Sequence, residues 1–346
     1  MLYIHKTAQI SPQETIFHID ADTIKHAVKG KLIAKEPLYP FIPAGILRRM
    51  GKSVKMGVGA ALTIIEKDEL NGIIIGTANG GMNDCMKFLQ QIVDYEEGML
   101  SPGNFVQGVP NAIASQIGLL TNNKGYNNTH VHEGLAFENA LMDAVMQLAE
   151  NKNNSYLVGA VDEISDFYHN IEILKGNFNS DNILAKDFYA TKQKGAIAGE
   201  GAAMFVVNNQ QEGAIAKLTG IDTFNNTDPE YLRKRLLDFK TKYQEEAPID
   251  LIISGENGDD RFDKYYATME STIGKDIPVV RFKHLCGEYS TATSYSLWLA
   301  CQLLQNQEVP SHLLKSENHP KQINRILIYN TYFGVQQSIM LLEKGV

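Results

Sequence analysis

The sequence predicts an α/β fold along the whole chain. Short apolar runs that are typical of buried strands recur, and turn residues bound each of them. Helical patterns lie between these runs, so strands and helices alternate. The predicted strands lie in the segments 70–81 (LNGIIIGTANGG), 155–165 (SYLVGAVDEIS), 201–209 (GAAMFVVNN), 248–258 (PIDLIISGENG), 277–282 (IPVVRF) and 323–334 (INRILIYNTYFG).

Two helices are predicted because their apolar residues repeat with the helical period. In the segment 138–152 the apolar face consists of Leu141, Val145 and Leu148. In the segment 294–307 it consists of Leu297, Ala300, Cys301 and Leu304. Each face predicts burial against a sheet.

The segment 168–195 has mixed charge and weak periodicity, which predicts a surface excursion. A polar, glycine-containing turn follows the strand at 201–209. We therefore place a boundary near residue 210, between a first half, 1–210, and a second half, 211–346.

The composition of the 346-residue chain excludes several classes of protein. A net charge of −8 argues against a nucleic-acid partner, which needs clustered lysine and arginine. The three cysteines are dispersed and form no CxxC pair, which indicates a reducing cytoplasm and no cysteine metal site. No signal peptide and no membrane span are expected, because no apolar run has the required length.

Several motifs, in order, resemble the β-ketoacyl-ACP synthase branch of the thiolase-fold superfamily. In the first half these are RRMGKSVKMGVGAAL, GIIIGTANGG, LSPGNFVQGVPNAIASQIGLLTNNKGYNNT and AIAGEGAAMFVV. In the second half they are KHLCGEYSTATSYSLWLACQLLQNQEVP and YNTYFGVQQSIML. The resemblance implies a thiolase-like α-β-α-β-α layered sandwich of two pseudo-repeated halves, normally dimeric.

The resemblance also implies a catalytic triad. In that family a cysteine at a strand-to-helix turn attacks an acyl thioester, and two histidines assist the decarboxylation of the malonyl unit. Here Gly134 stands at the position of the nucleophile, Gly255 at the first histidine and Glu288 at the second, while the family's lysine is retained as Lys283. The triad is therefore expected to be lost.

Other residues are assigned by the same resemblance. Phe333 corresponds to the family's gating phenylalanine near the acyl pocket, and Asn330 to a residue that helps to organise the active site. Cys286, between Lys283 and Glu288, is a further candidate for an acyl pocket. No metal or other cofactor is predicted.

The stretch THVHEG contains His130, His132 and Glu133 directly before Gly134. As metal ligands these residues fail, because in a strand the two histidines share one face while Glu133 points to the other. Since the family resemblance places this strand at the dimer interface, we interpret all three as interface groups. An alternative is a reshaped acyl-transfer or hydrolytic site at His132, Glu133 and Glu288, with Glu138 or Glu288 as general base.

A ketosynthase-like chain without its triad resembles the chain-length factors of type II polyketide and aryl-polyene systems. The first hypothesis is therefore a subunit that pairs with an active ketosynthase and shapes chain elongation, with an acyl carrier protein as a possible further partner. A homodimer of this chain is the alternative to such a heterodimer. The second hypothesis is an acyltransferase or another thioester-processing enzyme, and the third is a stand-alone acyl-binding protein.

Overall fold

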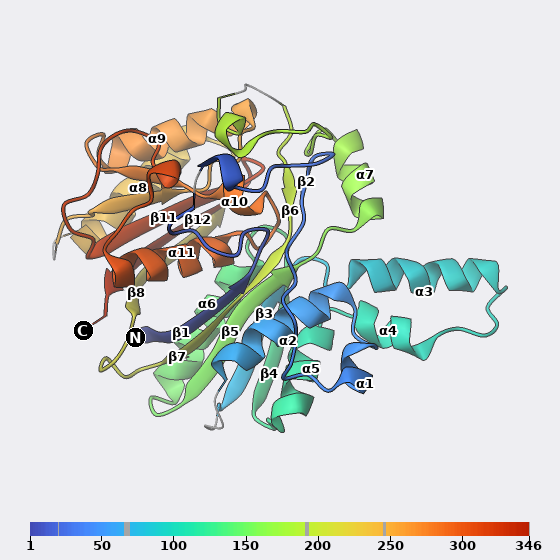
Figure 1. Ribbon diagram of the computed structural model, residues 1–346. Helices are drawn as coiled ribbons and strands as arrows, with labels where there is room; N and C mark the ends of the chain where they lie inside the picture. Colours follow the sequence, from blue (N-terminus) through green and yellow to red (C-terminus); the bar gives the residue numbers. More distant parts are fainter. Residues whose placement is uncertain (20, 66–69, 191–193, 245–246, 346) are drawn as a thin grey trace.

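The computed structural model describes residues 1–19, 21–65, 70–190, 194–244 and 247–345. Within these residues, ten strands form one sheet in the order β10-β9-β11-β12-β8-β1-β7-β5-β3-β4, and β2 pairs with β6 (Figure 1). The strands are β1 (Leu2–Ile10), β2 (Lys31–Leu32), β3 (Gly72–Thr77), β4 (Tyr126–Val131), β5 (Ser155–Asp162), β6 (Ala198–Gly199), β7 (Gly201–Asn208), β8 (Ala216–Asn225), β9 (Leu251–Ser254), β10 (Val279–Arg281), β11 (Arg325–Tyr332) and β12 (Gln336–Lys344).

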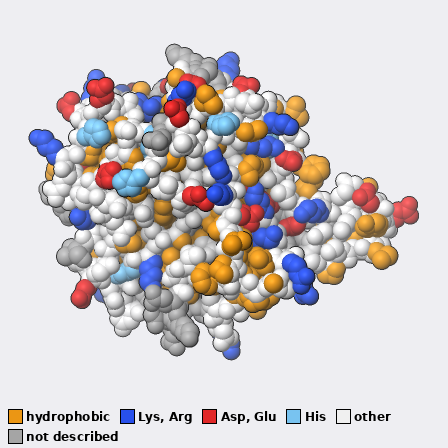
Figure 2. Space-filling model, viewed as in Figure 1, with side chains coloured by type: hydrophobic (Ala, Val, Ile, Leu, Met, Phe, Trp, Pro, Cys, Tyr) orange, Lys and Arg blue, Asp and Glu red, His pale blue; other side chains and the backbone are white. Residues whose placement is uncertain are grey.

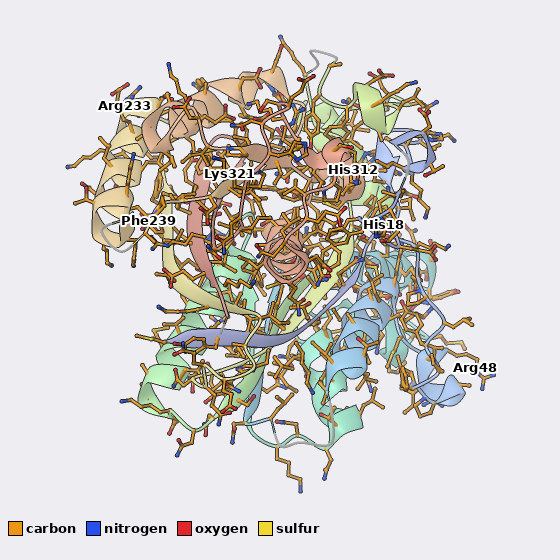
Figure 3. The ribbon with its side chains drawn as sticks, turned by 60° about the vertical axis from the view of Figure 1, so that its left-hand side comes forward. His18, Arg48, Arg233, Phe239, His312 and Lys321 are labelled. Carbon is orange, nitrogen blue, oxygen red and sulfur yellow. The ribbon has the colours of Figure 1, made fainter. Side chains whose placement is uncertain are left out.

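Helices connect most of these strands. They are α1 (Ala44–Leu47), α2 (Lys52–Ile64), α3 (Met82–Asp94), α4 (Pro102–Gly108), α5 (Ala112–Thr121), α6 (Ala136–Glu150), α7 (Asp166–Leu174), α8 (Pro229–Gln244), α9 (Asp263–Ile273), α10 (Lys283–Cys286) and α11 (Thr293–Asn306). Arg48, which follows α1, and Arg233 on α8 lie on opposite sides of the molecule (Figure 3).

The large sheet contains the same five-strand pattern twice. In the first half β4, β3 and β5 run parallel, and β7 and then β1 follow antiparallel. In the second half β10, β9 and β11 run parallel, and β12 and then β8 follow antiparallel. The equivalent strands also occur in the same order along the chain. The prediction of two pseudo-repeated halves is therefore confirmed.

Three buried clusters separate five layers. The central cluster contains the apolar faces of α6 and α11 and one face of each half-sheet. A second cluster lies between the first half-sheet and helices α2 and α5, and a third between the second half-sheet and helices α8 and α9. In β3, for example, Ile74 points to the central cluster while Ile73 and Ile75 point to the outer one, because successive side chains of a strand alternate. The predicted α-β-α-β-α sandwich is confirmed.

The two predicted helix faces are confirmed as well, since Leu141, Leu148 and all four apolar residues named in the second helix belong to the central cluster. The segment 168–195 is more ordered than predicted. It begins within α7 and buries the apolar side chains of Phe178, Ile183 and Phe188 in two small clusters, which hold the segment against the body of the molecule. Its residues 191–193 lie outside the described part. Residue 210 falls in the loop between β7 and β8, and the division into the halves 1–210 and 211–346 stays a prediction.

Candidate functional site

Gly134 lies in the short turn between β4 and α6, directly before the N-terminus of a 15-residue helix. A Cβ atom at this position would stand 2.2 Å from Cβ of Tyr332, far inside van der Waals contact. The backbone N–H of Gly134 donates a hydrogen bond to Oε1 of Gln336 at 2.6 Å. The space that a nucleophile would need is therefore filled by Tyr332, and the neighbouring amide already has an acceptor.

Gly255, at the end of β9, is equally enclosed. A Cβ atom there would lie 2.1 Å from Oδ1 of Asn330. The same Asn330 oxygen accepts a hydrogen bond from Nζ of Lys283 at 2.8 Å, and the carbonyl of Gly255 accepts one from the hydroxyl of Tyr266 at 2.6 Å. An imidazole at residue 255 would have to displace this arrangement.

Lys283 and Glu288 form a buried ion pair. Their Nζ and Oε2 atoms are 2.5 Å apart, and both side chains are at most 1% exposed. Nδ2 of Asn257 donates a second hydrogen bond to the same oxygen at 2.8 Å. Burial raises the pKa of Glu288, and Lys283 opposes this rise. Glu288 therefore serves as the counter-ion of Lys283.

Glu138, the other proposed general base, lies in the first turn of α6 and is completely buried. Burial raises its pKa to about 7, although Ser338, Thr293 and Lys283 oppose the rise. A carboxyl group with such a pKa can exchange protons near neutral pH. It does not line the pocket described next, so no substrate proton is within its reach there.

A pocket lies beside Tyr332, between the end of β5, helix α7 and the loop that contains Glu288. Its volume is about 380 Å³, including the open mouth. Among the site residues predicted from the sequence, Glu288 is the one that lines this pocket within the described chain. The sequence did not identify Tyr332, Gln336 or Tyr168. The sequence signal for Tyr332 is its bulk as the second tyrosine of the segment YNTYFG, because a bulky residue at this position faces the turn that contains Gly134.

Phe333 and Cys286 lie in packed surroundings. The backbone of Phe333 adopts φ 47°, and its ring centroid is 4.4 Å from that of Tyr332, 5.8 Å from Phe178 and 6.2 Å from Phe262. Cys286 is fully buried in the central cluster, and burial raises the pKa of its thiol. A protonated thiol is a poor nucleophile, so Cys286 does not replace the missing cysteine.

The strand β4 stands at one end of the large sheet and pairs with β3 alone among the described strands. Nε2 of His130 lies 2.8 Å from Oδ2 of Asp143, which also accepts hydrogen bonds from Tyr126 and Asn128. Burial favours the neutral carboxyl group, but these hydrogen bonds outweigh it and lower the pKa of Asp143. The outer side of this strand leaves a row of backbone groups open for another chain.

His132 and Glu133 follow β4 rather than continuing it. The backbone N–H of His132 donates to the carbonyl of Thr77 at 3.3 Å, and Glu133 is exposed. The expectation that both extend the strand is wrong, because the chain bends after Val131 to enter α6. Within the described ranges, no three His, Cys, Asp or Glu side chains are placed to hold a metal ion.

Helices α3 and α4 form an arm that projects from the body of the molecule (Figure 1). The rings of Phe88 and Phe105 hold the two helices together at 5.3 Å between centroids. Much of the apolar surface of the arm is uncovered, as Figure 2 shows. The exposed apolar residues of the arm include Leu89, Val93, Tyr95, Met99, Phe105 and Val106.

Comparisons with known proteins agree with this architecture. Residues 25–178 match the family model described as beta-ketoacyl synthase, N-terminal domain. None of the curated protein sequences is significantly similar to this chain. In the described part of the chain, every helix is too short or too polar to cross a membrane.

Solved structures match over the whole chain. A beta-ketoacyl synthase from Burkholderia phymatum STM815 has a TM-score of 0.78 at 14% identity, covering 100% of this chain and 99% of that one. The ishigamide ketosynthase/chain length factor has a TM-score of 0.75 at 16% identity, with coverages of 100% and 99%. The ketosynthase ApeO in complex with its chain length factor ApeC, from Xenorhabdus doucetiae, gives 0.77 at 13%, with 99% and 98%. The chain is thus ketosynthase-like in sequence over residues 25–178 and in fold throughout.

Proposed function

We propose that this ketosynthase-like chain is a non-catalytic subunit that pairs with an active ketosynthase and shapes the cavity in which its acyl chain grows. The observation that carries this proposal is the filled nucleophile position. Gly134 has no side chain, Tyr332 occupies the space above it, and Gln336 accepts the hydrogen bond of its amide. A thioester carbonyl that reached Gly134 would meet neither a nucleophilic side chain nor a free amide N–H at that residue.

Two surfaces support the pairing. The outer edge of β4 offers unpaired backbone groups, and the arm formed by α3 and α4 offers an apolar face. At the tip of the arm Glu96, Glu97 and Met99 adopt positive φ angles, which residues with a side chain rarely do. A partner that packs against the arm would cover the apolar face and hold this tip. Two of the similar structures contain a chain length factor together with its ketosynthase.

The alternative of thioester processing at His132, Glu133 and Glu288 has less support. Glu288 alone of the three lines the pocket in the described structure, and its Oε2 atom is engaged by Lys283 and Asn257. Glu133 is exposed at the surface, whereas Lys283 and Glu288 are buried. We therefore prefer the non-catalytic role.

Co-expression tests the proposal. The chain is produced with the ketosynthase encoded nearest to it, and native mass spectrometry measures the stoichiometry of the purified assembly. We expect a one-to-one heterodimer whose condensation activity with acyl and malonyl carrier-protein thioesters disappears when the partner's cysteine is replaced. A chain that stays a homodimer beside the ketosynthase, or that turns over these thioesters alone, would contradict the proposal.

A further inference from the structure

The pocket beside Tyr332 has aromatic walls. Four rings line it, and they come from distant parts of the chain: Tyr168 from α7, Phe178 from the excursion, Tyr289 from the loop before α11 and Tyr332 from the end of β11. The faces of aromatic rings carry partial negative charge and attract cations within about 6 Å of their centroids. Walls of this kind recur where proteins recognise organic ammonium groups.

The charged groups around the pocket have the sign that suits a cation. Three carboxyl groups line it, and none of the described lining residues is a lysine or an arginine. Glu288 is already paired with Lys283, and burial raises the pKa of Asp162 and raises that of Glu163 to about 7. A cation bound beside Asp162 and Glu163 would favour their charged forms. His169 also lines it, and burial lowers the pKa of this imidazole, so that it stays uncharged at neutral pH. A concave surface with carboxylates and no basic side chain attracts positive ligands and repels anions.

Three buried polar atoms at the pocket have no hydrogen-bond partner within the described structure. They are Oγ of Ser165, Nε2 of His169 and Oε1 of Glu288. Each of these residues is at most 3% exposed. Ser165 is also the N-cap residue of α7, yet its hydroxyl does not cap that helix. Because unpaired buried polar atoms are rare in native proteins, such a group of them indicates a missing partner.

We propose that this pocket binds a small organic cation with a primary ammonium group. An ammonium group has three N–H donors, and the hydroxyl of Ser165, the free carboxyl oxygen of Glu288 and Nε2 of His169, in the tautomer protonated at Nδ1, are acceptors for them. The four rings and the carboxyl groups of Asp162 and Glu163 stabilise its charge. An acyl chain would leave all three polar atoms unpaired, and an anion would lie beside carboxyl groups with no lysine or arginine in the described lining. The pocket shares Tyr332 and Glu288 with the site described above, but this proposal does not depend on the proposed subunit role.

Titration calorimetry with the full-length chain tests the proposal. The probes are ethanolamine, its uncharged analogue ethylene glycol, and tetramethylammonium, which is a cation without N–H donors. We expect saturable binding of ethanolamine, binding of tetramethylammonium that is about tenfold weaker or more, and no binding of ethylene glycol. Equal binding of ethanolamine and ethylene glycol would overturn the proposal. The absence of saturable ethanolamine binding would overturn it too, because ordered water would then account for the unpaired atoms.

Variants locate the binding site. Ser165→Ala and Tyr168→Leu each remove one recognition element from the wall, and we expect each to weaken ethanolamine binding about tenfold. Tyr231→Leu is the matched control, since Tyr231 is a partly exposed tyrosine on α8 that does not line this pocket. Circular dichroism checks that all three variants fold. Unchanged affinity in both pocket variants, with the fold intact, would place any binding elsewhere and refute the site.

Discussion

The two halves of the molecule share one topology, but they differ at the outer edge of the sheet and in the segment that leads from this edge to the central helix. In the first half the edge strand β4 has six residues and open backbone groups, and a short turn that includes the exposed Glu133 leads into α6. In the second half the equivalent β10 has three residues, and Lys315 and Leu314 pair with its edge. Every residue from 282 to 292 is buried before α11 begins.

The insertions follow the same division. Between β9 and β10 the chain forms the single helix α9 after a short 3-10 turn, whereas between β3 and β4 it forms the projecting arm and α5. The half with the open edge is therefore also the half with the uncovered apolar surface. In the second half, Leu314 and Lys315 of the same chain cover the sheet edge. In the first half the edge of β4 and the apolar side chains of the arm stay exposed, as the proposed pairing with a partner subunit requires. The following predictions test that comparison.

The arm gives the largest expected effect on assembly with a partner. Replacing Leu89, Val93 and Val106 together by serine removes three apolar anchors, and we expect the affinity for the ketosynthase partner to fall roughly 100-fold or more. The stability of the isolated chain should hardly change, because these side chains are exposed. Calorimetric titration of the partner measures the affinity. The matched control is the double variant Tyr231→Ser and Leu237→Ser on α8, where both side chains are also exposed. An equal loss of affinity in both variants would contradict a specific role of the arm in binding the partner.

In the second half, the stability of the buried segment 282–292 is expected to depend on the charge of Lys283. Lys283→Met leaves Glu288 buried without its counter-charge, and we expect the free energy of unfolding in urea to fall by about 3–5 kcal/mol. Adding Glu288→Gln should restore part of this loss. In the control Lys315→Met, the lost ion pairs with Glu256 and Glu270 involve a partly exposed lysine, so the loss should be about 1 kcal/mol or less. A mild effect of Lys283→Met would mean that the buried pair contributes little.

The short turn of the first half should not accept a nucleophile easily. Gly134→Cys places a Cβ atom against Tyr332, and overpacking of this kind costs about 1–3 kcal/mol of unfolding free energy. In a double-mutant cycle, Tyr332→Ala should lessen the cost of Gly134→Cys. Chemical denaturation of the four proteins measures the coupling. Strict additivity of the two substitutions would contradict the contact.

The smallest effect is expected at Asp143, behind β4. Because hydrogen bonds lower the pKa of this carboxyl in the folded state, its contribution is complete above the unfolded pKa of about 4 and is lost as the pH falls through the folded pKa. Asp143→Asn should therefore cost about 1 kcal/mol of unfolding free energy at pH 7. The difference from the natural chain should shrink below about pH 4. A difference that stays constant down to pH 2 would contradict this assignment.

Much of the fold could be predicted because apolar side chains report burial directly. Ile73, Ile74 and Ile75 form a run that a strand buried on both faces requires, and β3 lies where that run predicts. The arm was missed, although Leu89 and Val93 have the spacing of a helix face. An apolar helical face normally indicates a core helix, and sequence alone does not say whether the chain itself covers it.

The candidate site divides in the same way. The sequence by itself determined that residues 134 and 255 are glycines, that residue 288 is a glutamate and that Lys283 is present. Only the tertiary structure decided that Tyr332 fills the space beside Gly134, that Gln336 accepts the hydrogen bond of the Gly134 amide, and that Glu288 neutralises Lys283. These contacts join residues up to 202 positions apart. Local pattern fixes which side chains exist and which are buried, whereas long-range packing fixes which of them meet.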